Sequence, residues 1–226
     1  MISHLEKKVT FRYLKPKKKD GFLNIISIFS FIGISLGVSV LIIVMSVMNG
    51  FRSELVNKII GFNAHVTIKP YSKKIDNSKI NNKKLINLSS QLIFSNSGEG
   101  VLFYKESTKG LILRGYEIED FLKLNVINND NFEGNPKKLV NNGISVGKDL
   151  AINYNLEIGD QILIMSPSGI ETIIGSIPKQ EPFIVTSIFD SGLSDFDHNV
   201  AFINIKSLEG LFDLDESKRN LEIYLK

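Results

Sequence analysis

The sequence predicts an α+β protein with one N-terminal transmembrane helix followed by a mixed α/β domain outside the membrane. Residues Gly21–Phe51 form 31 consecutive positions without Asp, Glu, Lys, Arg or His. As a helix they would span roughly 46 Å, which exceeds the ~30 Å hydrocarbon core of a bilayer. Beyond Phe51, helix-like and strand-like segments alternate irregularly, without a repeating strand–helix–strand unit. This irregular order is typical of the α+β class.

The charges predict the orientation of that helix. Residues 1–20 hold seven Lys or Arg residues against two acidic residues, whereas the whole chain has a net charge of +3. Because basic residues flank the cytoplasmic side of membrane helices, we expect residues 1–20 in the cytoplasm, a membrane helix at 21–51 that extends to about residue 60, and an outer domain at 61–226. A basic head on a slightly acidic domain argues against a nucleic-acid partner.

A competing interpretation of the N-terminus, a cleaved signal peptide, is weaker. A cleaved signal peptide has an apolar region of about 7–15 residues and a small-residue cleavage site, and Gly21–Phe51 is too long and ends without such a site. The spacing of Leu5, Val9 and Tyr13 predicts a short amphipathic helix before Pro16. The chain has no cysteine, which excludes disulfides, thiolate zinc sites and cysteine lipidation.

Two stripes run along the predicted membrane helix. The first consists of small residues that would let a neighbouring helix approach closely: Ser30, Gly33 and Gly37. The second stripe is bulkier and lies further toward the outer end: Val40, Val44, Met48 and Phe51. Taken alone, the small stripe is a weak motif, because small residues are common in membrane helices. Taken alone, the bulky stripe is more simply explained as a lipid-facing or packing surface.

The outer domain is expected to begin after a helix end at Gly61. Its predicted strands are 65–68, 101–104, 110–114, 144–146, 161–165, 183–188, 200–203 and 221–225. Its predicted helical segments are 84–94, 148–153 and 208–212. We expect a turn around Ser107 and Thr108, a polar loop at 71–84, and a long Asn-rich loop at 125–142 that would mark a seam between subdomains.

Three chemical functions receive little support. Gly143–Asp149 resembles a phosphate-binding loop, but it is one residue short and has Asp where Ser or Thr is required. Asp195, Asp197 and His198 are more typical of a solvated turn than of a metal site. The three histidines lie in no hydrolase motif, so we predict no catalytic residues, no metal and no cofactor.

Several segments together resemble one family. Its members are the LolC/LolE permeases of the lipoprotein-releasing ABC transporter, which are permeases of the MacB type. The resemblance covers nearly the whole chain and rests on the following segments: Arg12-Tyr13-Leu14, Gly33–Val38, Ser46–Phe51, Leu113-Arg114-Gly115, Gly147 with Leu150-Ala151, Gly159-Asp160-Gln161, Gly175–Gln180 with Phe183-Ile184-Val185, and Ser191-Gly192-Leu193 with Phe196-Asp197.

The resemblance implies a MacB-like periplasmic core domain and a location in the bacterial inner membrane. It implies a permease subunit without ATPase activity of its own, which works with a cytoplasmic ABC ATPase and a second permease subunit, identical or paralogous. The implied substrates are lipoproteins, which a periplasmic lipoprotein carrier accepts. The family has three further membrane helices after the periplasmic domain, and this sequence stops at Lys226. We therefore expect a fragment, a truncated gene or one half of a split permease.

The resemblance also assigns roles to particular residues. The outer end of the first helix helps to line the lipoprotein pocket, which maps onto the bulky stripe from Val40 to Phe51. A protruding loop that recruits the carrier maps onto residues 168–180, and the candidate contacts there are Ile170, Ile173, Ile174, Gly175, Ile177 and Pro178. A plain hairpin with inward-packed isoleucines remains the alternative for this loop. For the whole chain, the alternative is a membrane-anchored periplasmic scaffold that transports nothing.

Overall fold

The computed structural model describes residues 3–14, 21–71, 75, 83–128, 132–172 and 175–226. The chain divides into two compact units, Met1–Leu55 and Val56–Lys226. The first unit contains α1 (His4–Leu14) and most of α2 (Gly21–Phe62). Leu5 and Val9 are exposed on α1, as are the other side chains of this helix that the structure describes.

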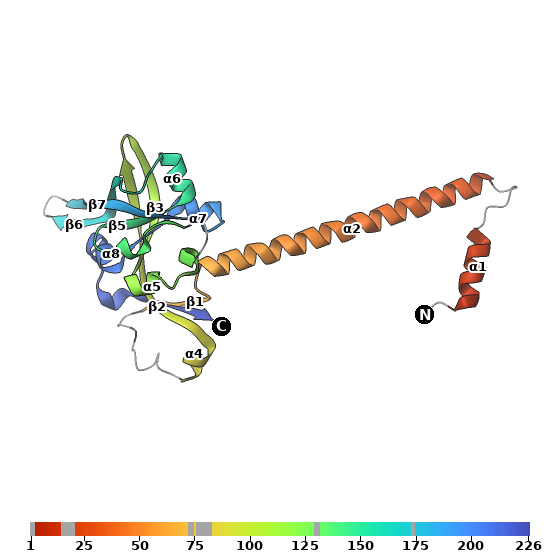
Figure 1. Cartoon of the computed structure of the whole chain (residues 1–226), viewed down its shortest axis with the longest axis horizontal. Helices are drawn as coiled ribbons and strands as arrows, with labels where there is room; N and C mark the ends of the chain where they lie inside the picture. The colour runs from red at the N-terminus through yellow and green to blue at the C-terminus, as the bar shows by residue number, and fades with distance from the viewer. Residues whose placement is uncertain (1–2, 15–20, 72–74, 76–82, 129–131, 173–174) are drawn as a thin grey trace. The chain divides into compact units, whose positions relative to one another are not determined.

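Helix α2 is continuous over 42 residues (Figure 1). In the part of the chain that the structure describes, it is the one helix long and apolar enough to cross a membrane. The helix passes through Gly61 and ends at Phe62, which agrees with the predicted end near residue 60 to within two residues. The Phe62 side chain is buried, and its packing against the domain outweighs the low helix propensity of the preceding glycine.

The second unit is built on a mixed β-sheet. The described strands are β1 (Val66–Ile68), β2 (Ser89–Tyr104), β3 (Ser107–Tyr116), β4 (Glu133–Gly134), β5 (Gly143–Gly147), β6 (Gln161–Thr172), β7 (Gly175–Phe189), β8 (Val200–Asn204) and β9 (Asn220–Leu225). The accompanying helices are α4 (Lys83–Leu88), α5 (Ile118–Phe121), α6 (Lys148–Tyr154), α7 (Ser194–Asn199) and α8 (Ile205–Phe212), with 3-10 turns η1 (Asn125–Asn128), η2 (Pro136–Lys138) and η3 (Glu216–Lys218).

Neighbouring strands follow the order β1-β9-β2-β3-β8-β5-β7-β4, and β6 pairs with both β2 and β7. The pairs β3–β8 and β5–β7 are parallel, and the other pairs are antiparallel. A mixed sheet with helices of irregular order confirms the predicted α+β class.

Two hydrophobic cores lie on opposite faces of this sheet. Successive side chains of a strand point to opposite faces, and along β8 the residues Ala201 and Ile203 belong to one core while Phe202 belongs to the other. The first core includes Leu208 from α8. The second core is rich in aromatic rings and includes Phe62 from the end of α2. The second core therefore ties the last turn of α2 to the sheet.

Three local predictions are wrong. The segment 84–94 is not one helix, because α4 ends at Leu88 and β2 begins at Ser89. Strand pairing with β9 buries Ile93 there and overrides the helical spacing of the leucines. The β2–β3 turn lies at Lys105 and Glu106, since Tyr104 already pairs with Ser107. The expected seam at 125–142 is not a boundary, because β4 pairs with β7 in the same sheet.

Candidate functional surfaces

The bulky stripe on α2 is an uncovered apolar surface within this chain. Between 50% and 63% of each side chain is exposed at its four positions: Val40, Val44, Met48 and Phe51. Other apolar residues of the same helix, such as Leu41 and Ile43, are exposed to a similar extent. Exposure alone therefore does not distinguish this stripe from the rest of the membrane segment.

The small stripe and the bulky stripe form one continuous face of α2. The seven positions follow each other at intervals of three or four residues, which keeps them on one side of an α-helix: Ser30, Gly33, Gly37, Val40, Val44, Met48 and Phe51. A methyl group at Gly33 or Gly37 would meet no other atom of the chain within 4 Å. This face is flat in its first half and bulky in its second half. The sequence alone had suggested two separate stripes, not one continuous face.

The end of α2 is held by aromatic packing. The Phe62 ring stacks on Phe196, with ring centroids 4.3 Å apart and an interplanar angle of 11°. Phe189 and Phe202 lie at 6.1 and 5.8 Å from the same ring. Aromatic pairs at these distances add to the free energy gained by burial.

Arg114 on β3 caps the same helix end. Its guanidinium donates to the Phe62 carbonyl oxygen at 3.5 Å and to Asn63 Oδ1 at 3.2 Å. A cation is favourable there, because the C-terminal carbonyl groups of a helix carry a partial negative charge. Arg114 also forms a 3.1 Å ion pair with Glu222 on β9, and both side chains are largely buried. The C-terminal cap of α2 is therefore supplied by a residue 52 positions away in sequence.

Glu222 is the centre of a buried hydrogen-bond network. Besides the Arg114 contact, its carboxylate accepts from Ser95 Oγ at 2.6 Å, from Tyr116 Oη at 3.1 Å and from Tyr224 Oη at 3.0 Å. Burial raises the pKa of both tyrosines. Burial would lower the pKa of Arg114, but the acidic groups Tyr116, Glu222 and Tyr224 raise it on balance. We name this set the Glu222 network.

Two grooves border Phe62, and both carry charged groups. One, of about 400 Å³, is lined among others by Lys58, Asp190 and Gly192. The other, of about 390 Å³, is lined among others by Arg114 and Glu222. The second groove is also lined by apolar side chains, among them Ile112, Phe196 and Val200, so its charged groups do not by themselves set it apart from the apolar face of α2.

The predicted carrier-binding loop is the outer part of a β-hairpin formed by β6 and β7, which lie side by side (Figure 1). Ile170 pairs with Ile177 and Thr172 pairs with Gly175. Ile177 is 54% exposed and Pro178 is also exposed. Ile173 and Ile174 lie outside the described residues. Ile177 therefore does not pack inward, whereas the plain-hairpin alternative expects it to do so.

The profile described as "MacB-like periplasmic core domain" matches residues 27–226. The chain belongs to this family. It is 27% identical to the lipoprotein-releasing system transmembrane protein LolC of Neisseria meningitidis serogroup B, over 98% of the chain and 54% of that protein. It is 29% identical to LolE of Haemophilus influenzae, over 80% of the chain and 45% of that protein.

A solved structure of the periplasmic region of MacB from Actinobacillus actinomycetemcomitans is also similar, with a TM-score of 0.45, 8% identity, and coverage of 74% of this chain and 78% of that one. The chain spans about half the length of the curated relatives. The predicted resemblance to the N-terminal part of LolC and LolE is thereby confirmed.

Two of the motifs that carry the resemblance have structural explanations. A side chain at Gly115 would meet Leu208 Cβ at 3.1 Å and the Ile205 backbone at 3.0 Å, so this glycine lets α8 approach the sheet. A side chain at Gly147 would collide with the backbone of Asp197. Both glycines therefore permit close packing of the backbone or of a helix against the sheet.

His198 lies in a cluster that sequence reasoning missed. Its Nδ1 lies 3.1 Å from Asp149 Oδ2 and 3.2 Å from Ser194 Oγ, and its Nε2 faces the Asn153 amide. Ser194 and Asp149 thus share one ring nitrogen, whereas a catalytic triad places them on opposite nitrogens. The cluster joins α6 to α7 and has no catalytic geometry. Asp197 instead accepts from the Ser191 amide.

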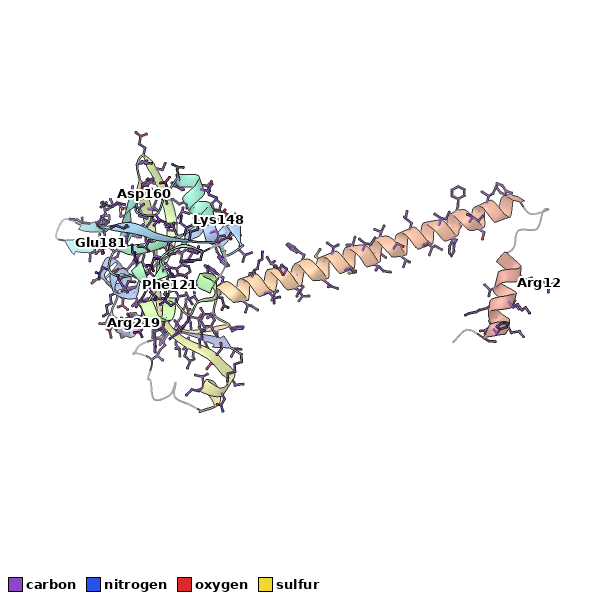
Figure 2. The ribbon with its side chains drawn as sticks, in the orientation of Figure 1. Arg12, Phe121, Lys148, Asp160, Glu181 and Arg219 are labelled. Atoms are coloured by element: carbon purple, nitrogen blue, oxygen red, sulfur yellow. The ribbon has the colours of Figure 1, made fainter. Side chains whose placement is uncertain are left out.

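Asp160, labelled in Figure 2, gives the domain a pH-dependent contact. Its Oδ2 accepts from the Glu157 amide at 2.9 Å and from Tyr104 Oη at 2.8 Å, and these bonds lower its pKa. A lowered pKa in the folded state stabilises the protein above the unfolded-state pKa, and this stabilisation is lost as the pH falls through the folded-state pKa.

We therefore expect Asp160→Asn to lower the unfolding midpoint at pH 7 and to have a smaller effect at pH 3, as measured by denaturant unfolding. Tyr104→Phe, which removes one of the two donors, should change the midpoint in the same direction by less. An equal deficit of Asp160→Asn at both pH values would show that the charge of the carboxylate is not responsible.

Proposed function

We propose that this chain is the N-terminal part of a permease subunit of an ABC transporter that releases lipoproteins from the inner membrane. The observation that supports this most strongly is the similarity to LolC, which extends over 98% of the chain and so includes both the membrane helix and the domain. In this proposal the N-terminus is cytoplasmic and the domain is periplasmic. A cytoplasmic ATPase and a second permease subunit, identical or paralogous, complete the transporter.

The two halves of the continuous face of α2 have different roles in this proposal. The flat half, Ser30–Gly37, packs closely against a helix of the second subunit, since small residues let helix backbones approach. The bulky half, Val40–Phe51, holds the two helices further apart and leaves an apolar space between them. Acyl chains of a lipoprotein are stabilised in such a space because it removes apolar surface from water. The change from small to bulky residues along one continuous face of α2 supports this division.

The outer part of the β6–β7 hairpin receives the periplasmic carrier in this proposal. Its described apolar side chain, Ile177, is exposed and followed by the exposed Pro178. Exposed apolar groups at the end of a hairpin present a small contact surface without a cost in folding, because they leave the core intact. The same hairpin carries Ile170, Ile173, Ile174 and Gly175 as further candidate contacts.

Site-specific photo-crosslinking tests the acyl-chain surface. A photoreactive residue at Val44 should capture a lipoprotein in membranes of the native cell. A residue at Ile42 is the matched control, because it is also apolar and exposed but two positions away, on the opposite side of the helix. We expect lipoprotein capture at Val44 to exceed that at Ile42 by about tenfold, the ratio that 1.4 kcal/mol produces.

Equal labelling of Val44 and Ile42, or labelling of both by bulk phospholipid alone, would remove the acyl-chain surface from the proposal. In that event the scaffold alternative, a membrane-anchored domain without transport, would become the better account.

A further inference from the structure

The β6–β7 hairpin has two parts, a base with regular strand pairing and an outer part beyond a shift of register. From Gln161 to Ser166, β6 pairs regularly with β7, and the last of these pairs is Ser166 with Lys179. The register then shifts, and pairing resumes with Ile170 opposite Ile177. Residues 167–169 lie opposite the single residue Pro178, so the strand is bulged there. A bulge bends a strand and interrupts its hydrogen bonds, which separates the outer part of the hairpin from its base.

Lys179 lies at the last regular pair before the bulge and contacts helix α8. Its Nζ donates to the Gly210 carbonyl oxygen of α8 at 2.5 Å, and it lies 3.4 Å from Glu181 of its own strand (Glu181 is labelled in Figure 2). The last four carbonyl groups of a helix have no partner within the helix, and Gly210 is one of these. A cation is also favoured at this negative end of the helix.

Helix α8 is a rigid support for such a contact. Its residues Leu208 and Leu211 have no exposed surface. Two glycines of the sheet let the helix pack closely, because a side chain at Gly98 would collide with Phe212 and one at Gly115 would press against Leu208. Its first turn is capped by Asn204, whose side chain accepts from the Lys206 amide. The contact from Lys179 therefore connects the end of the regular hairpin to a fixed part of the domain.

We propose that Lys179 is a positioning residue that fixes the direction of the outer hairpin by binding the C-terminal end of α8. The contact restrains β7 at the last regular pair, immediately before the bulge. The base of the hairpin is also held by strand pairing and by core residues such as Ile164 and Phe183, but Lys179 supplies the side-chain contact nearest to the bulge. Without this contact, the outer part samples more directions. The consequence for the carrier rests on the proposed function, since the carrier is assigned there to the outer hairpin.

Distance measurements test the restraint without the carrier. The chain has no cysteine, so spin labels at Ile177→Cys and Lys206→Cys report only the distance between the outer hairpin and α8. Lys179→Met, which keeps the apolar stem and removes the amine, should broaden the distance distribution in the membrane-bound protein. Lys179→Arg should keep it narrow. Lys137→Met, which removes an exposed lysine elsewhere, is the matched control and should have no effect.

A second measurement tests whether the direction of the outer hairpin affects capture of the carrier. With a photoreactive residue at Ile177, Lys179→Met should lower the yield of carrier capture about threefold, while Lys179→Arg and Lys137→Met retain it. An unchanged distance distribution in Lys179→Met would overturn the proposal. A broadened distribution with unchanged capture would overturn its consequence for the carrier. If the unsubstituted protein captures no carrier, the proposed function of the hairpin fails, and the distance measurement alone decides the role of Lys179.

Discussion

Replacing Arg114 by Met lowers the free energy of unfolding of the domain by about 3–5 kcal/mol, the range for a buried ion pair that loses one partner. The substitution leaves the buried Glu222 carboxylate without its cation and removes the donors to Phe62 and Asn63 at the end of α2. Chemical unfolding of the chain in detergent micelles, followed by tyrosine fluorescence, measures the change. The chain has six tyrosines and no tryptophan, and Tyr116 within the Glu222 network is fully buried.

The double variant Arg114→Met with Glu222→Gln is the control for charge. Glutamine keeps an acceptor for Ser95, Tyr116 and Tyr224 and removes the unpaired charge, so the double variant should be more stable than Arg114→Met alone. A loss below about 1 kcal/mol for the single variant, which is typical of an exposed pair, would contradict the structural role assigned to Arg114.

If the outer hairpin receives the carrier as proposed, replacing Ile177 by Asp lowers capture of the carrier by roughly 30-fold. A carboxylate at the centre of an apolar contact is buried without a partner, and loss of a central contact costs about 2 kcal/mol or more, or roughly 30-fold in affinity. Because Ile177 is exposed, the folded chain should lose no more than about 0.5 kcal/mol of stability. Crosslinking between the subunit and the carrier in intact cells measures the effect.

Ile152→Asp provides the matched control for this experiment. Ile152 is an isoleucine of α6 with 66% of its surface exposed, and it receives the same change in charge. We expect Ile152→Asp to leave carrier capture unchanged. Equal capture by the Ile177→Asp variant and the unsubstituted chain would return the hairpin to a purely structural role, whereas equal losses in both variants would indicate a general effect of surface charge.

The elements with strong local signals were predictable from the sequence. The uncharged segment Gly21–Phe51 lies within α2, and β5 with the following α6 lies where Ile144–Val146 and Lys148–Asn153 predicted them. In these segments, local spacing and tertiary packing favour the same structure. The segment 84–94 differs because its helical spacing of leucines competes with pairing between β2 and β9, and a local pattern contains no information about a partner strand.

The arrangement around the end of α2 was not predictable in the same way. Arg114 and Glu222 are 108 positions apart in sequence, and neither has a local pattern that indicates a buried ion pair. The contact between Lys179 and Gly210 likewise joins residues 31 positions apart. By contrast, the continuity of the two stripes on α2 follows from helix geometry alone, so the sequence contained that information before the structure was known.

Depletion of this subunit in its native cell tests the central claim most directly. The measurement is the fraction of newly made outer-membrane lipoprotein that is retained in the inner membrane after the membranes are separated by density. If the chain belongs to a lipoprotein-releasing permease, the retained fraction rises as the subunit is lost and falls again when the unsubstituted subunit is restored. An unchanged distribution of lipoproteins after full depletion would contradict the account.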